Sequence, residues 1–124
     1  MWIDSHTHVE ARDGVDGYAA TLARAAAAGV RGVLAVGGTE GMNAAALAAA
    51  REHPGLVRVA LGYDRDLAVT LTASDSTLEA ATARLRDDLA AQRDVVGAIG
   101  ETGLDYYYGP EDRKSTRLNS SHRT

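Results

Sequence analysis

The chain of 124 residues has no cysteine, no phenylalanine, two prolines and a single lysine. The absence of cysteine excludes disulfide bonds and thiolate metal sites. Without phenylalanine the core has to be built largely from alanine, which buries little apolar area per residue. No run of about 18 apolar residues is present to span a membrane. The first residues also lack the basic start and apolar stretch of a signal peptide. We therefore expect a soluble, cytoplasmic protein with no membrane association.

The composition suits one globular domain, with 45% hydrophobic and 24% charged residues. The charge, however, is divided unevenly along the chain. Residues 1–111 contain nine arginines, no lysine and sixteen acidic residues, whereas residues 112–124 carry a net charge of +3. The acidic body has no basic patch, which argues against general affinity for nucleic acids.

The last residues differ from the rest of the chain in a second way. Residues 112–122 (DRKSTRLNSSH) match the translation of a common sequencing-library adapter. We therefore expect residues 1–111 to be part of a longer natural protein and residues 112–124 to be a non-native tail. The alternative is a genuine basic C-terminus.

Short apolar runs alternate with helical patterns along the body. The runs predict strands at residues 2–8, 30–36, 56–61 and 95–99. Alanine- and leucine-rich segments predict helices at residues 16–28, 40–52 and about 77–92, with a variable connection at 63–76. Gly29 is expected to end the first helix, and Thr39 to cap the second.

This order of elements predicts an α/β protein with a parallel sheet covered by helices. Two closures satisfy the pattern: an open doubly wound sheet, or the first four βα units of an eight-stranded barrel. In both folds the active site lies at the carboxyl ends of the strands. The ionisable residues that follow the first and fourth predicted strands are therefore the candidates for chemistry.

His6 and His8 are the first candidates. Residues i and i+2 of a strand point to the same side, so both imidazoles face one space, where they can bind a divalent cation. Asp4 has the same parity and is expected to orient an imidazole by a hydrogen bond. The alternative is a pair of polar residues in an exposed loop.

Glu101 is the second candidate, since it follows the fourth predicted strand and lies between Gly100 and Gly103. A carboxylate there can bridge two cations opposite the histidines. Asp105 is a further candidate as a metal-site or phosphate-loop residue. For both acids the alternative is an ordinary helix-start or loop carboxylate.

Two segments together resemble the TatD family of metal-dependent hydrolases. They are residues 4–8 (DSHTH) and residues 96–107 (VGAIGETGLDYY), and their spacing is also that of the family. The resemblance implies the N-terminal half of a (β/α)8 TIM-type barrel of the amidohydrolase kind. It also implies a DNase that trims 3′ ends by hydrolysing phosphodiester bonds.

The resemblance assigns roles to three residues. His6 and His8 would hold one metal ion, and Glu101 would be the catalytic residue that bridges to a second. The ions would be Mg²⁺, Mn²⁺ or Zn²⁺, the substrate DNA or another phosphodiester, and no obligate protein partner is implied.

The sequence departs from the family pattern in two places. Tyr63-Asp64 follows Gly62, where His-Pro is common in the family. Two later histidines and a late aspartate, which would complete the metal sites, are absent from residues 1–111. The 124-residue polypeptide is therefore expected to be inactive by itself.

Two other functions fit part of the pattern. An amidohydrolase acting on C–N or carboxylic ester bonds also uses two histidines after its first strand. Such relatives often carry a carbamylated lysine at strand four, where this chain has Glu101 and its body has no lysine. A non-catalytic α/β binding domain is the third possibility.

The origin of residues 112–124 can be tested directly. Amplifying the source locus across codon 111, and sequencing it without that adapter, should show a reading frame that continues for roughly 150 residues, as a barrel of about 250 residues requires. We expect two further histidines and a late aspartate in the continuation. A frame that instead reproduces residues 112–124 and then stops would contradict the expectation and favour the binding domain.

Overall fold

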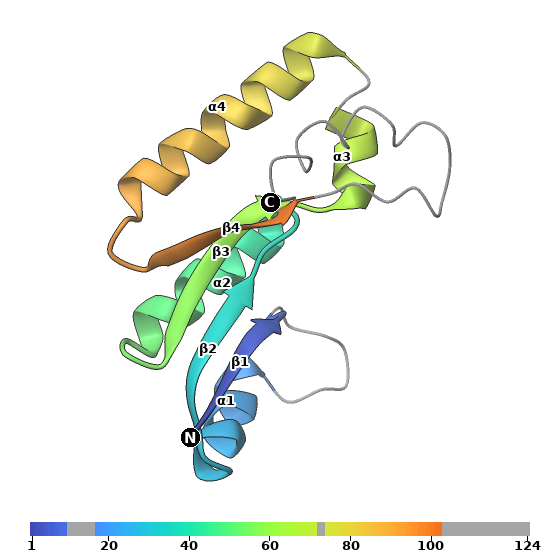
Figure 1. The fold of residues 1–124 in the computed structure, drawn as a ribbon. Coiled ribbons are helices and arrows are strands. Elements are labelled where there is room, and N and C mark those ends of the chain that lie inside the picture. Colours follow the sequence, from blue (N-terminus) through green and yellow to red (C-terminus); the bar gives the residue numbers. More distant parts are fainter. Residues whose placement is uncertain (10–16, 72–73, 103–124) are drawn as a thin grey trace, which may run out of the picture.

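The computed structural model describes residues 1–9, 17–71 and 74–102. Within these residues strands alternate with helices along the chain (Figure 1). The strands are β1 (Trp2–Thr7), β2 (Val30–Val36), β3 (Val57–Tyr63) and β4 (Val96–Thr102). The helices are α1 (Tyr18–Ala27), α2 (Glu40–Glu52), α3 (Arg65–Leu71) and α4 (Asp75–Ala91).

The strands form one parallel sheet in the order β1-β2-β3-β4. Each connection thus leads to the next neighbour, and right-handed connections of this kind place their helices on one face. Side chains of α1, α2 and α4 indeed pack into a single core against the sheet. A doubly wound sheet would reverse direction and carry helices on both faces. The expected α/β fold, the N-terminal half of a (β/α)8 barrel, is therefore confirmed over these four strands.

Small side chains build the core between the helices and the sheet. Ala46, Ala49 and Ala50 lie on the buried side of α2, in one cluster with Val59 and Leu61 of β3. Val59 and Leu61 are the largest side chains that are fully buried in the described residues. Because alanine side chains are small, the backbone of α2 can approach the sheet closely.

Local sequence signals set the helix ends. The Thr39 hydroxyl accepts a hydrogen bond from the N–H of Met42 at 3.2 Å, which confirms the predicted cap of α2. Gly29 follows α1 with φ +97°, a left-handed conformation that favours glycine, as expected at the end of a helix. The predicted elements at 30–36 and 40–52 agree with β2 and α2 to the residue.

The main differences lie near the carboxyl ends of the later strands. The connection predicted at 63–76 contains α3, whose seven residues are too few for a helical period to be evident in the sequence. The Asp64 carboxylate begins this helix by accepting a hydrogen bond from the N–H of Leu67 at 2.9 Å. Gly62 and Glu101 lie inside β3 and β4 rather than after them.

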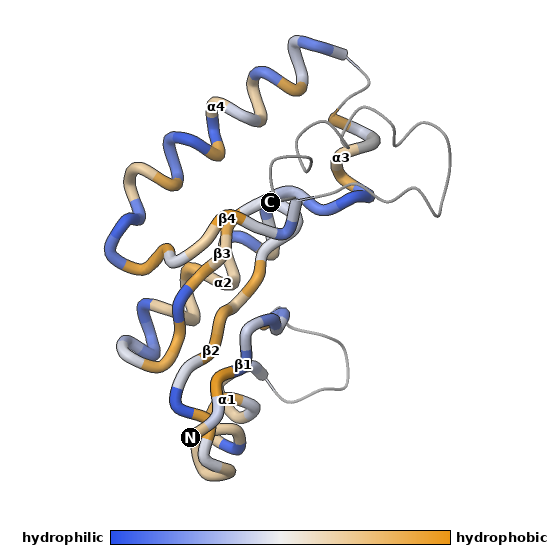
Figure 2. The backbone as a smooth tube through the Cα atoms, in the orientation of Figure 1, coloured by the Kyte–Doolittle hydropathy of each residue, from blue (hydrophilic) through white to orange (hydrophobic). Residues whose placement is uncertain are grey.

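The apolar residues of β1 and β4 are less well covered than those of the central strands. Trp2 and Ile3 are 71% and 68% exposed, and Ile99 is 65% exposed. These two strands stand at the ends of the strand order, so within the described residues each has a neighbour on one side only. The central strands β2 and β3 carry most of the buried apolar residues of the sheet and are mainly orange in Figure 2.

Polar contacts hold α4, the longest described helix, beside the sheet. Arg84 of α4 forms an ion pair with Glu40 of α2, and the Tyr63 hydroxyl donates to the Ala81 carbonyl at 3.3 Å. Partial burial and then the Glu40 carboxylate raise the pKa of Tyr63, so its hydroxyl keeps the proton for this bond. No helix among the described residues has both the length and the apolar character that crossing a bilayer requires.

Replacing Leu61 tests the position of the core. Leu61→Ala should lower the free energy of unfolding by about 2–5 kcal/mol, because the side chain is fully buried and leaves a cavity. Leu78→Ala, at a position 37% exposed on α4, should cost less than about 1 kcal/mol. Urea unfolding followed by circular dichroism measures both. Equal losses would show that the core does not lie where the structure places it.

Candidate metal centre

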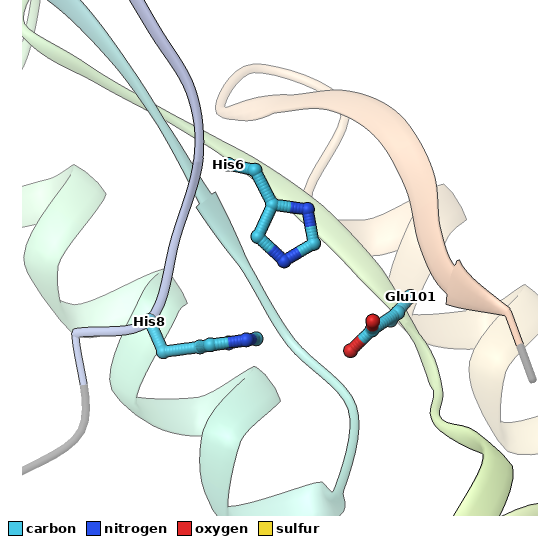
Figure 3. A group of neighbouring side chains, drawn as sticks. All are labelled: His6, His8 and Glu101. Atoms are coloured by element: carbon cyan, nitrogen blue, oxygen red, sulfur yellow. The ribbon is translucent and has the colours of Figure 1, made fainter.

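The structure brings His6, His8 and Glu101 together. One ligand atom from each of these side chains lies within 4.8 Å of the other two. His6 belongs to β1, His8 follows it directly, and Glu101 belongs to β4 (Figure 3). His6 is exposed, whereas His8 and Glu101 are half-buried. We refer to these three residues as the ligand group.

The ligand group exists because the sheet curls. Neighbouring strands are about 4.8 Å apart, so a flat sheet would separate β1 from β4 by about 14 Å. The approach of the ligand atoms to within 4.8 Å, together with a main-chain hydrogen bond from Glu101 of β4 to Gly37 beyond the end of β2, indicates a curved sheet, as in the wall of a barrel.

Two glycines permit this curvature at the carboxyl ends of the strands. The N–H of Glu101 donates to the Gly37 carbonyl at 3.3 Å, so the end of β2 contacts β4 across β3. Gly62 lies between them on β3, where a Cβ atom would come within 2.3 Å of the Glu101 carbonyl oxygen. Any side chain at residue 62 would force these segments apart.

The ring of His8 is oriented by a main-chain contact. Its Nδ1 lies 2.9 Å from the Val36 carbonyl oxygen. Because a carbonyl only accepts hydrogen bonds, this contact assigns the proton to Nδ1 and leaves the lone pair of Nε2 for a metal ion. The His6 ring stands nearly perpendicular to that of His8, at an angle of 89° with the ring centres 5.1 Å apart.

Asp4 acts differently from the prediction. Its carboxylate accepts a hydrogen bond from the main-chain N–H of His6 at 3.0 Å, instead of orienting an imidazole through the ring. A carboxylate two residues away reaches the backbone more readily than the ring, because Asp side chains are short. The contact that orients an imidazole comes instead from the main-chain carbonyl of Val36, which accepts from His8. Because every residue has a main-chain carbonyl, this contact could not be predicted from the sequence.

The donor set of the ligand group fits a divalent cation. Imidazole nitrogen and carboxylate oxygen are ligands of Zn²⁺, Mn²⁺ and related ions. Two ligands on opposite sides of one ion, each bound at about 2.0–2.2 Å, are at most about 4.4 Å apart, close to the separations found here. Among the described residues, no second group of this kind is found.

Other residues at the strand and helix ends are not part of this group. Gly37 and Gly38 follow β2 and lie beside other protein atoms, since a Cβ atom on Gly38 would come within 3.0 Å of the Asp64 carboxylate. That contact is typical of a packed turn. His53 caps the C-terminal end of α2, outside the ligand group. Asp105 and the predicted boundary at residue 111 lie outside the described residues.

Sequence analysis missed one buried polar residue near the ligand group. Asn43 of α2 is 7% exposed, and its amide makes two hydrogen bonds to the main chain of Gly62. The available signal was a single amide on the helix face that otherwise carries alanines, at Ala46, Ala49 and Ala50.

The chain matches the model of a known protein family over most of its length. The model of the family described as "TatD related DNase" matches residues 3–119, a range that includes the whole ligand group. Among curated proteins, no sequence matches the chain.

Replacing His8 tests the assignment of the ligand group. His8→Ala should weaken binding of Mn²⁺ and Zn²⁺ to the 124-residue chain by at least about 100-fold, because even residues that only support metal ligands contribute 10–100-fold. His53→Ala, a histidine outside the group, is the matched control and should leave the affinity unchanged. Isothermal titration calorimetry measures both dissociation constants. Similar affinities for the two variants would contradict a metal site at His8.

Proposed function

The chain belongs to the family of TatD-related DNases, and on that premise we propose that its ligand group serves the hydrolysis of phosphodiester bonds in DNA with one or two divalent cations. TatD-related DNases are metal-dependent hydrolases. The observation that carries the proposal is the meeting of His6, His8 and Glu101, from the first and fourth strands, within 4.8 Å. Trimming of DNA from its 3′ end is the form of activity that we propose.

Each member of the ligand group has a distinct part. His6 and His8 would hold one cation through ring nitrogens, and because Nδ1 of His8 contacts the Val36 carbonyl, Nε2 is the atom of His8 that would bind it. Glu101 would hold this cation and a second one through its carboxylate. When bound, divalent cations would supply an activated water and stabilise the leaving oxygen of a phosphodiester.

The charge of the chain agrees with a site that depends on cations. Residues 1–111 carry a net charge of −7, so this body repels the DNA backbone. Bound divalent ions reverse the local charge where the phosphate has to lie. We therefore propose that DNA is engaged at the ion site and not through a basic surface.

The activity is tested on single-stranded DNA labelled at its 5′ end. The protein assayed, called the uninterrupted protein below, is the longer natural protein of which residues 1–111 are expected to be a part. With Mg²⁺ or Mn²⁺ the label should appear in a ladder of products shortened from the 3′ end, and EDTA should abolish the ladder. His6→Ala and Glu101→Gln should each lower the rate by at least about 100-fold, because each removes a ligand and not merely its support. Glu52→Gln, which changes an acid outside the ligand group, should retain the rate.

Two results would overturn the proposal. One is DNA cleavage that persists in His6→Ala and Glu101→Gln. The other is intact DNA together with ion-dependent hydrolysis of carboxylic ester or amide substrates, which would assign the site to C–N or ester chemistry. The 124-residue polypeptide, assayed beside the uninterrupted protein, is expected to bind the ion without cleaving DNA.

A further inference from the structure

Asn43 is deeply buried, and its amide is hydrogen-bonded at both ends. It is 7% exposed and is the buried polar side chain of the described core. Its Nδ2 donates to the Gly62 carbonyl at 3.1 Å, and its Oδ1 accepts from the Gly62 N–H at 3.3 Å. An amide is costly to bury unless both of its ends are hydrogen-bonded, and here both ends bind one residue of β3.

The main chain of Gly62 lies directly against that of Glu101. A Cβ atom on Gly62 would come within 2.3 Å of the Glu101 carbonyl oxygen and 2.5 Å of the Gly100 carbonyl carbon. Any displacement of Gly62 therefore moves the peptide that carries the Glu101 side chain.

Asn43 also touches the second support of Glu101. A Cβ atom on Gly37 would lie 1.7 Å from the Asn43 Oδ1, so the amide occupies the space beside this glycine. The Gly37 carbonyl in turn accepts the hydrogen bond from the Glu101 N–H at 3.3 Å. The two segments that hold the main chain of Glu101 are thus both in contact with one side chain of α2.

We propose that Asn43 is a positioning residue for Glu101. It fixes Gly37 and Gly62 relative to each other, and thereby holds the Glu101 carboxylate opposite His6 and His8. The inference rests on the proposed function, because it assigns to Asn43 the geometry of the same ion site.

The test measures ion binding by the 124-residue chain, with Mn²⁺ affinity from calorimetry and the visible absorption spectrum of bound Co²⁺ as readouts. Asn43→Ala removes both hydrogen bonds to Gly62, whereas Asn43→Asp keeps the acceptor and removes the donor. Both should weaken Mn²⁺ binding by about 10–100-fold, the range found for residues that support metal ligands. Both should also change the Co²⁺ spectrum, which reports the arrangement of the ligands.

Ala46→Gly is the control for a purely structural effect. It weakens the same buried face of α2 at a fully buried residue and keeps the Asn43 amide that bonds to Gly62. It should lower the melting temperature and leave the Mn²⁺ affinity and the Co²⁺ spectrum unchanged.

Gly37→Ala provides an independent variant. The added methyl group has to displace the Asn43 amide, so this variant should weaken Mn²⁺ binding as Asn43→Ala does. In the Asn43→Ala background the space is vacant, and Gly37→Ala should have little additional effect. Such non-additivity is expected for residues that act through one contact.

Separate results overturn the inference and the proposed function. If His8→Ala loses the ion while folded Asn43→Ala, Asn43→Asp and Gly37→Ala keep the affinity and spectrum of the unsubstituted chain, the inference alone is wrong. If the unsubstituted chain binds Mn²⁺ no better than His8→Ala does, the proposed function fails and the inference fails with it.

Discussion

The hydrogen bond from the Glu101 N–H to the Gly37 carbonyl joins β4 to the end of β2 across the intervening strand. It is possible because Gly62, on that intervening strand, presents no side chain to the Glu101 main chain. Parallel strands in a flat sheet would hold the first and fourth members too far apart to share an ion. The curvature at these glycines turns an acid on one edge and two histidines on the other into a single group.

The histidine side of this group depends on main-chain chemistry as well. The Val36 carbonyl that accepts from Nδ1 of His8 belongs to the last residue of β2, the strand that pairs with β1. The same strand end therefore orients His8 through Val36 and contacts Glu101 through Gly37. Because these supports are main-chain carbonyls, the site is sensitive to shifts of the backbone at the end of β2.

The small side chains of the core bear on the same site. Ala46, Ala49 and Ala50 let α2 lie close to the sheet, and at that distance the short side chain of Asn43 reaches the main chain of Gly62. Larger residues on this face would move the helix outward and break both contacts. The chain has no phenylalanine, and its core buries little apolar area per residue. The same small side chains allow close contact between the helices and the carboxyl ends of the strands.

The sequence by itself determined the local elements and the faces of their residues. The apolar runs and Thr39 were sufficient to predict β2 and α2 to the residue, because periodicity and caps act over a few neighbours. The two-residue spacing of His6 and His8 was sufficient to place both rings in one space. The element pattern left a barrel wall and a doubly wound sheet open, the motif resemblance favoured the barrel, and the strand order decided for it. The contacts of Asn43 and Val36 came from the tertiary structure alone. The physical reason is that strands pair through backbone groups that every residue shares, so the order and curvature of a sheet leave little trace in side-chain patterns.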